Sequence, residues 1–331
     1  MVASAQDKDI NFFPQFPPYS DPKTGLLAQI PSSWIPYAQL MRIDRPAGLY
    51  AFYLPYLIGI MYAACIVPVP PEPRALLVLA LILLPFNVLM RGAACTWNDN
   101  VDQRFDRRVE RCRHRPVARG AVSTTQANLF TLIQLALIYP VTALLPSACF
   151  PHVLVTVVLF GVYALMKRVT YYPQVILGVS FAWAIFFCVA ALGMDPLHGK
   201  TFVPTLALCL ANVLWTIIYD TIYAHQDVAD DEKAGVKGMA LRFKNNTKLL
   251  ATILSVGQIG FLVLCGVRAG FSGVYFIGTV GGVTAAMTYY IYDVDLKRPE
   301  SCGAWFRDQF RIVGGGFLAG LIGEYATKLM T

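Results

Sequence analysis

The chain has 331 residues, of which 56% are hydrophobic and only 14% are charged, and its mean hydropathy is positive. This composition excludes an ordinary soluble domain and predicts an all-α protein that crosses a lipid bilayer several times. The formal net charge is +7, but the positive residues gather in particular connections between apolar segments. We therefore expect a membrane partner and no nucleic acid.

Residues 1–35 are polar and contain several prolines, which oppose regular helix and strand. They lack the apolar core of a secretory signal, and acidic residues precede the first arginine, Arg42, which disfavours a mitochondrial presequence. We expect a cytosolic tail over residues 1–35 that partly caps a membrane domain over residues 36–331.

Nine apolar segments approach the roughly 20 residues that a bilayer-spanning helix needs. They fall at 47–67, 75–96, 127–145, 153–167, 174–193, 202–220, 249–267, 274–292 and 313–330. Arginine and lysine are concentrated after the second, fourth, sixth and eighth segments. By the positive-inside rule, the N-terminus and these even-numbered connections face the cytosol.

Two arginines, Arg42 and Arg45, stand just before the first segment. At this position an arginine can extend to anionic lipid headgroups. It can equally hold a carboxylate or a phosphate at the mouth of a site. The sequence leaves both interpretations open.

The second segment runs into a polar stretch, Asn98–Asp106. Residues four apart share one face of a helix, so Asn98, Asp102 and Asp106 form a stack of oxygen ligands. Beside hydrocarbon such a stack needs a cationic partner, and we predict a divalent ion that carries phosphate. Arg91 lies on the same face, where we expect it to pair with a site carboxylate.

Positive side chains near this stack are candidates for binding the phosphate groups. Most arginines of the following connection act as topological signals, but a diphosphate needs more positive charge than its metal ions supply. We expect one or two of Arg108, Arg113 and Arg115 to fold over the site. Tyr163 and Lys167 are four apart at the end of the fourth segment, so a phenol and an ammonium can reach one anion.

The sixth segment runs into a second acidic cluster, which contains Asp220, Asp227, Asp230 and Asp231. Asp227 and Asp231 repeat the spacing of Asp102 and Asp106, and continuous helical spacing puts Asp220 on the same face. Two facing carboxylate stacks predict one site for Mg²⁺ and a diphosphate. If the diphosphate leaves an allylic carbon, the carbocation needs a dry chamber with aromatic faces.

These paired motifs resemble those of a known family. Asn98-Asp99-x-x-Asp102-x-x-x-Asp106 and Asp220-(six residues)-Asp227-x-x-x-Asp231 are similar to the two signatures of the UbiA superfamily of intramembrane aromatic prenyltransferases, and Tyr163-x-x-x-Lys167 is similar to its third element. The resemblance covers the chain from Arg42 onward. It implies nine transmembrane helices around a central cavity that opens laterally to lipid.

The resemblance also implies a role for each candidate residue. Mg²⁺ is expected on the oxygen ligands Asn98, Asp102, Asp227 and Asp231, with Asp106 in support. The diphosphate is expected on Tyr163, Lys167 and a connection arginine, with Arg108 and Arg115 as the candidates. Asp220 is expected to orient the phenol of an aromatic acceptor or to take its proton, while the acceptor carboxylate meets Arg42 or Arg45. Asp102, Asp220 and Asp227 are thus the expected catalytic residues.

Within the family, residues 40–48 and 167–174 most resemble the 4-hydroxybenzoate polyprenyltransferase branch. The tail, which does not resemble a presequence, is similar to that of fungal meroterpenoid farnesyltransferases, which act on phenolic acids, usually in the endoplasmic reticulum. We therefore predict a farnesyltransferase that uses farnesyl diphosphate and a phenolic acid, in the endoplasmic reticulum with its site facing the cytosol. The alternative is a 4-hydroxybenzoate polyprenyltransferase of ubiquinone biosynthesis in the mitochondrial inner membrane.

A different class of protein is also compatible with carboxylates inside a membrane. Such groups often mark the path of a cation or proton through a transporter. The predicted carboxylates cluster at one membrane face, whereas an ion path needs groups across the full thickness. The enzyme is therefore the favoured prediction.

Overall fold

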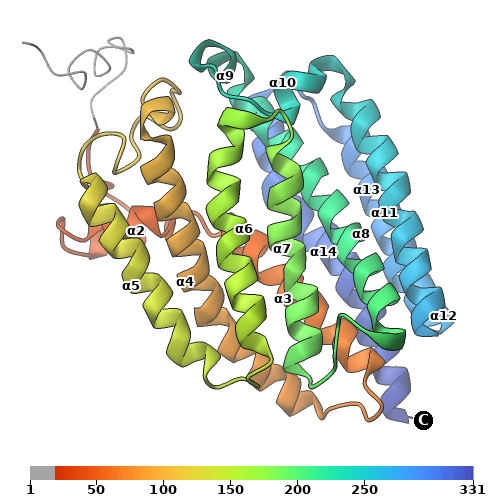
Figure 1. Cartoon of the computed structure of the whole chain (residues 1–331). Helices are drawn as coiled ribbons and strands as arrows, with labels where there is room; N and C mark the ends of the chain where they lie inside the picture. The colour runs from red at the N-terminus through yellow and green to blue at the C-terminus, as the bar shows by residue number, and fades with distance from the viewer. Residues whose placement is uncertain (1–18, 331) are drawn as a thin grey trace, which may run out of the picture.

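The computed structural model describes residues 19–330, and every regular element in that range is a helix (Figure 1). The long helices are α3 Ala47–Ile66, α4 Pro73–Asp106, α5 Thr124–Thr142, α6 Cys149–Val169, α7 Pro173–Ala191, α8 Gly199–Ala224, α11 Thr247–Ala269, α13 Gly282–Asp293 and α14 Pro299–Met330. Shorter helices occupy the connections: η1 Leu26–Gln29, α2 Ile35–Leu40, η2 His225–Asp227, α9 Val228–Ala234, α10 Met239–Phe243, η3 Lys244–Asn246, α12 Gly273–Tyr275 and η4 Phe276–Gly281. The predicted all-α fold is confirmed.

Seven helical stretches within residues 19–330 are long and apolar enough to cross a membrane. The sequence predicts nine, and the two that differ are α5 and α14, which correspond to the third and ninth predicted segments. Both lie in the same bundle as the others (Figure 1). Glutamine and threonine in α5, and glycines and charged residues in α14, make them less apolar than the other long helices.

The outer surface of the bundle is apolar. Large hydrophobic side chains on α5, α6 and α11 are more than half exposed, among them Leu129, Leu132, Leu154, Ile253 and Val256. An apolar surface of this extent is unfavourable in water and is typical of a lipid-facing protein. Helices α3, α7 and α8 pack in the interior, where Tyr62, Phe187 and Trp215 are fully buried.

Glycines bring α14 close to the segment formed by η4 and α13. A Cβ atom at Gly316 would lie 3.1 Å from the backbone of Gly282 and Val283, and one at Gly278 would lie 2.6 Å from Cα of Gly320. Small residues of this kind allow helices in membranes to pack with their backbones in contact. They fix the position of α14 against the rest of the bundle.

The two acidic motifs lie at the same end of the bundle but on helices of different form. Helix α4 continues unbroken for 34 residues and carries the first motif on its last turns. The second motif does not lie on one continuous helix, contrary to the prediction: α8 ends at Ala224, η2 is a 3₁₀ turn, and α9 follows. His225 anchors this turn, because its Nε2 lies 2.9 Å from Oγ1 of Thr247 at the start of α11.

Part of the predicted tail packs on this same end. Residues 1–18 of the tail lie outside the described range. The hydroxyl of Tyr19 accepts a hydrogen bond from Nε2 of Gln39 (3.0 Å), and the Arg119 guanidinium lies 3.7 Å from the Tyr19 ring centroid. Arg119 belongs to the connection between α4 and α5, so the described part of the tail contacts that connection.

Candidate active site

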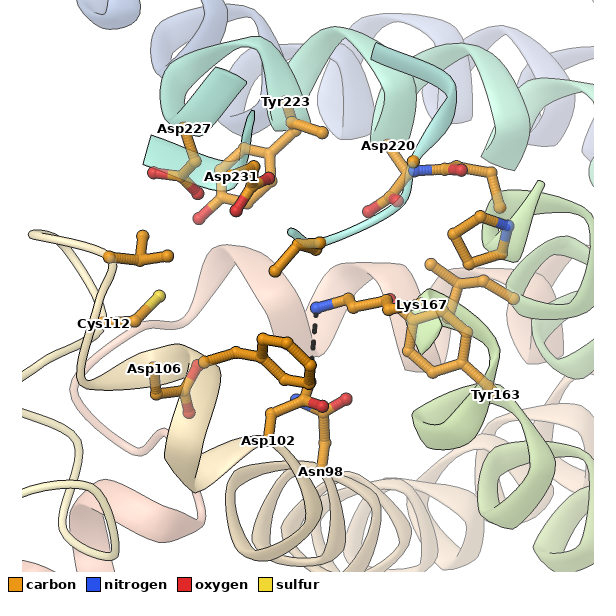
Figure 2. Close-up of a pocket in the computed structure, with 18 of the residues that line it drawn as sticks. Asn98, Asp102, Asp106, Cys112, Tyr163, Lys167, Asp220, Tyr223, Asp227 and Asp231 are labelled. Atoms are coloured by element: carbon orange, nitrogen blue, oxygen red, sulfur yellow. Dashed lines mark ion pairs between the residues drawn. The ribbon is translucent and has the colours of Figure 1, made fainter. Parts of the chain in front are cut away.

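A cavity of about 260 Å³ lies among the ends of α4, α6 and α8 (Figure 2). Its lining comes from Arg42 before α3, from α3, α4, the 107–123 connection, α6, α7, α8, η2 and α9, and from residues 236–241. The carboxylates that line it are Asp102, Asp106, Asp220, Asp227 and Asp231. The structure therefore brings members of both acidic motifs to one cavity, as the spacing predicts.

Asn98, Asp102 and Asp106 form the α4 wall on successive helical turns (Figure 2). Asp102 and Asp106 are only 2% and 5% exposed. Oδ1 of Asn98 and Oδ1 of Asp102 are buried and accept no hydrogen bond, and Nη2 of Arg168 lies 3.7 Å from Oδ1 of Asp102. A buried oxygen that accepts no hydrogen bond costs free energy, so this wall is suited to a cationic ligand.

The opposite wall carries Asp227 from η2 and Asp231 from α9 (Figure 2). Asp220 lines the same cavity from the preceding helix, α8. Arg111 grips Asp227 with two nitrogens: its Nε donates to Oδ1 and Oδ2 at 2.9 and 3.1 Å, and its Nη2 donates to Oδ2. Nη1 of Arg111 donates to the hydroxyl of Tyr223 at 2.9 Å. This arginine comes from the 107–123 connection and therefore joins the two sides of the cavity.

Lys167 reaches between the two walls (Figure 2), with its Nζ 3.6 Å from Oδ2 of Asp102. Tyr163 lies one turn earlier on α6 and also lines the cavity. Gln174 closes the site at the start of α7, where its Oε1 accepts a hydrogen bond from the backbone of Met239 at 3.2 Å. The predicted pairing of a phenol and an ammonium is thus present in the cavity.

Arg115 supports the α4 wall from the connection. Its Nη1 lies 3.0 Å from both carboxylate oxygens of Asp106 and 3.2 Å from Oδ1 of Asp99. Burial alone would lower the pKa of Arg115, but the facing carboxylates, Asp106 above all, raise the pKa well above its usual value. Arg115 is therefore a permanent cation at the edge of the cavity.

The two arginines that are predicted to bind the carboxylate of the aromatic acceptor, Arg42 and Arg45, differ in their placement. Arg42 lines the cavity, but its Nη2 is bound to Oδ1 of the fully buried Asp99 at 2.5 Å. Its φ of 57° is one that side-chain-bearing residues rarely adopt. Arg45 does not line the cavity: it is half exposed, and its Nε lies 3.5 Å from Asp44.

Two further arginines do not lie where the sequence predicts. Arg91 does not pair with a site carboxylate; it donates to the backbone carbonyl of Arg45 at 2.5 Å. The small Gly48 on α3 leaves room for this arginine to turn away from the site. Arg108 lines a separate surface hollow with Phe105 and Arg168, because it follows Asp106 by two residues and so extends from another side of the chain.

The donor atoms fit a magnesium ion that shares its ligands with phosphate. Within residues 19–330, no three carboxylate, histidine or cysteine groups are close enough to hold a metal ion by themselves. Mg²⁺ commonly binds through one or two carboxylates and completes its octahedron with water and phosphate oxygens. Oδ1 of Asn98 and Oδ1 of Asp102, which accept no hydrogen bond, match that requirement together with Asp227 and Asp231 across the cavity.

Two site residues escape prediction by sequence pattern. Asp99 stands beside Asn98 in the motif, but its helical position points it away from the stack and toward Arg42 and Arg115. Arg111 is one of several arginines in a connection without helical periodicity, so spacing gives no signal for it. Cys112 also lines the cavity, and burial raises the pKa of its thiol, which keeps it neutral.

Comparison with known proteins agrees with this geometry. The model of the UbiA prenyltransferase family matches residues 52–315. The prenyltransferase ascA of Acremonium egyptiacum is 42% identical over 320 residues, which cover 94% of this chain and 91% of that protein. The DMOA farnesyltransferase nvfB of Aspergillus novofumigatus is 33% identical, with coverage of 92% and 95%.

A mitochondrial relative and a solved structure extend the comparison. The mitochondrial 4-hydroxybenzoate polyprenyltransferase of Homo sapiens is 40% identical over 81% of this chain and 69% of its own length. A UbiA homologue from Archaeoglobus fulgidus, solved with GPP and Mg²⁺, has the same fold, with a TM-score of 0.64 at 18% identity over 88% of this chain and 99% of that one. The predicted resemblance is confirmed, and the chain belongs to the UbiA prenyltransferase family.

Proposed function

We propose that this prenyltransferase transfers a farnesyl group from farnesyl diphosphate to an aromatic carbon of a small phenolic acid in a Mg²⁺-dependent reaction, as in meroterpenoid biosynthesis. The observation that carries the proposal is that two acidic walls, with Lys167 and Tyr163 between them, line one cavity. An ion and a diphosphate bound there would touch both walls.

The acidic walls bind the metal in this proposal. Oxygen atoms for Mg²⁺ come from Asn98, Asp102, Asp227 and Asp231, with Asp106 in support. Bound Mg²⁺ neutralises the diphosphate and so makes it a better leaving group. Lys167 and Arg111 already pair with Asp102 and Asp227, and these cations are therefore near the phosphate oxygens as well.

The diphosphate is held by cations and a phenol of the chain. Lys167 and Tyr163 project into the cavity from α6, and Arg115 contributes from the connection. Charge-assisted hydrogen bonds of this kind are roughly twice as strong as neutral ones. Arg111 joins them, whereas Arg45 and Arg108 lie outside the cavity.

The aromatic acceptor binds next to Asp220. The C1–O bond of the donor breaks, C1 bonds to a ring carbon ortho to a hydroxyl, and the ring then loses the proton from that carbon. Asp220, which lines the cavity from α8 together with Tyr163 and Gln174, orients the phenol through its hydroxyl group and accepts the ring proton, the only proton that the acceptor releases. Phe52 and Phe160 line the apolar part of the cavity, where they pack on the prenyl chain and help to keep water away from the developing cation.

Relatives support the donor and the acceptor class. The farnesyltransferase nvfB and the prenyltransferase ascA align over more than nine-tenths of this chain, and the Archaeoglobus homologue was solved with GPP and Mg²⁺. The human 4-hydroxybenzoate polyprenyltransferase, at 40% identity, keeps the ubiquinone reaction as the second candidate.

Mass spectrometry of products separates the two candidates. Purified enzyme is given farnesyl diphosphate with an orsellinic-acid-type phenolic acid, with 4-hydroxybenzoate, or with both in competition. We expect a product one farnesyl group heavier from the phenolic acid, formed with diphosphate release that stops when EDTA removes the metal. Turnover of 4-hydroxybenzoate alone would favour the ubiquinone reaction, and ion flux into vesicles without any product would favour a transporter.

The membrane arrangement follows from the same proposal. We count α5 and α14 as spans, which gives nine, with the site open to the cytosol and the protein in the endoplasmic reticulum. The positive residues of the 107–123 connection and of residues 233–248 support this orientation.

A further inference from the structure

One side of the cavity is formed by the connection after α9, residues 236–241, which we call the cover segment. It joins the end of α6 to the start of α7. The backbone nitrogen of Lys237 donates a hydrogen bond to the carbonyl oxygen of Lys167 at 3.0 Å, and the backbone nitrogen of Met239 donates to Oε1 of Gln174 at 3.2 Å. The residues of the cover segment that line the cavity are Val236, Lys237, Gly238, Ala240 and Leu241.

The cover segment borders the part of the cavity that contains Asp220. The carboxylate of Asp220 interacts with the side chains of Gln174 and Lys167, the same two residues that the cover segment contacts through its backbone. Asp220 lies apart from Asp227 and Asp231 (Figure 2). The cover segment is therefore next to the place that the proposed reaction gives to the aromatic acceptor.

Gly238 is the residue of the cover segment that has no side chain. Its backbone does not require glycine, because φ of −171° and ψ of 162° are extended values that any residue adopts. Packing does not require glycine either. Apart from the adjacent chain, a Cβ atom at this position would have one neighbour within 4 Å among the described residues, Nε2 of Gln174 at 3.8 Å. The missing side chain therefore leaves space beside Gln174 in the wall of the cavity.

We propose that this space receives a substituent on the ring of the phenolic acid, so that Gly238 determines which acceptors the enzyme uses. This inference rests on the proposed prenyl transfer and adds a determinant of acceptor specificity. The aromatic ring is rigid, and the proposed reaction fixes it at two positions: a hydroxyl group at Asp220 and the reacting carbon against C1 of the donor. A ring substituent therefore has a fixed direction and, unlike a flexible chain, cannot turn aside through a lateral opening to lipid.

The space beside Gly238 gives the two candidate acceptors different contacts. An alkyl-substituted phenolic acid of the orsellinic-acid type fills it, whereas 4-hydroxybenzoate leaves it empty and forgoes the dispersion contacts of its walls. A side chain at position 238 would fill the same space from the protein. The wild type should therefore prefer the substituted acid, and a larger residue at position 238 should shift the preference toward 4-hydroxybenzoate.

A competition assay tests this role of Gly238. Equal concentrations of the substituted acid and 4-hydroxybenzoate are given with farnesyl diphosphate, and the ratio of the two products is measured by mass spectrometry. We expect Gly238→Val to lower the ratio of substituted to unsubstituted product about tenfold or more, because one methylene in a pocket already changes selectivity by about tenfold. Gly238→Ala should lower the ratio less, and neither variant should raise the KM for farnesyl diphosphate.

The matched control is Gly260→Val on α11. Gly260 is exposed, does not line the cavity, and has nothing within 4 Å of a Cβ atom. The same substitution there should leave the product ratio unchanged.

The product ratio does not depend on how much enzyme is folded, and Gly238→Ala decides the question if the valine variant is inactive. A ratio that changes less than about twofold in every active Gly238 variant would overturn the inference. A wild type that prenylates 4-hydroxybenzoate but not the substituted acid would overturn it too, as would a raised KM for farnesyl diphosphate at an unchanged product ratio. Absence of any prenylated product from the wild type with either acceptor would instead refute the proposed function.

Discussion

Arg115 is the residue on which the charge balance of the α4 wall depends most. It contacts Asp106 through two oxygens and Asp99 through one, and both carboxylates are almost fully buried. Asp99 is further bound by Arg42. The protein itself therefore neutralises Asp99 and Asp106, whereas Asn98 and Asp102 present to the cavity oxygen atoms that accept no hydrogen bond.

Removing Arg115 should destabilise the protein because it leaves buried carboxylates without their partner. We expect Arg115→Met to lower the free energy of unfolding by about 3–5 kcal/mol, measured as reduced thermal stability in detergent. Arg311→Ala is the control: Arg311 forms an exposed pair with Asp308, and surface pairs contribute about 1 kcal/mol or less. Equal effects of the two substitutions would contradict the structural role of Arg115.

Asp220 should be needed for catalysis more than for donor binding. We expect Asp220→Asn to reduce turnover of the phenolic acid about 100-fold or more, as loss of a general base usually does, with little change in the affinity for farnesyl diphosphate. Asp230→Asn is the control, since Asp230 does not line the cavity and accepts a hydrogen bond from the backbone of Glu110 instead. Turnover of Asp220→Asn within threefold of the wild type would exclude the role.

At the residue scale, prediction from sequence succeeds where side chains lie on a regular helix. Asn98, Asp102 and Asp106 line the cavity because four-residue spacing on α4 holds to its last turn. Spacing cannot choose among the arginines of the 107–123 connection, whose turns have no fixed period. Arg111 reaches Asp227 by a contact between residues more than a hundred positions apart, which only the folded chain defines.

Helices α4 and α8 present their acidic motifs differently. Helix α4 keeps its regular form through the motif, whereas α8 stops at Ala224 and a 3₁₀ turn carries the chain into α9. Short 3₁₀ turns are common at helix ends, and contact with α11 through His225 stabilises this one. The sequence predicts that Asp220, Asp227 and Asp231 share a site, but the tertiary contact decides their relative orientation.

Helix α14 depends on glycines to stay against η4. We expect Gly320→Ala to lower the thermal stability, because the new Cβ would collide with the backbone nitrogen of Thr279 and lie 2.9 Å from the carbonyl carbon of Gly278. The control is Gly315→Ala on the same helix, where nothing lies within 4 Å of a Cβ. That substitution should be neutral or stabilise by about 0.5–1 kcal/mol through helix propensity. A stable Gly320→Ala variant would contradict the close packing.

The whole molecule places its acidic site, its densest positive connections and its described tail contacts at one end of the bundle (Figure 1). Composition and hydropathy suffice to predict a helical membrane bundle, because burial in lipid leaves a strong signal in the sequence. They do not fix the number of spans, since α5 and α14 mix polar residues and glycines with apolar ones.

Orientation in the membrane can be read from a natural glycosylation sequon. Asn245-Asn246-Thr247 lies in the connection after α10, which the positive-inside rule assigns to the cytosol. We expect this site to stay unmodified in cells with secretory glycosylation. His198→Asn combined with Lys200→Thr creates a sequon in an odd-numbered connection and should be glycosylated, as gel mobility before and after glycosidase treatment reports. The opposite pattern would invert the orientation.

The central claim is that the α4 wall and the α8–α9 wall hold one Mg²⁺-bound diphosphate together. The most direct test is calorimetric titration of farnesyl diphosphate, with and without Mg²⁺, into wild type, Asp102→Asn, Asp227→Asn and the double variant. We predict Mg²⁺-dependent binding that each single substitution weakens, with a coupling energy of about 1 kcal/mol or more between them. Losses that add within about 0.3 kcal/mol, or binding indifferent to Mg²⁺, would mean that the two walls do not share a ligand.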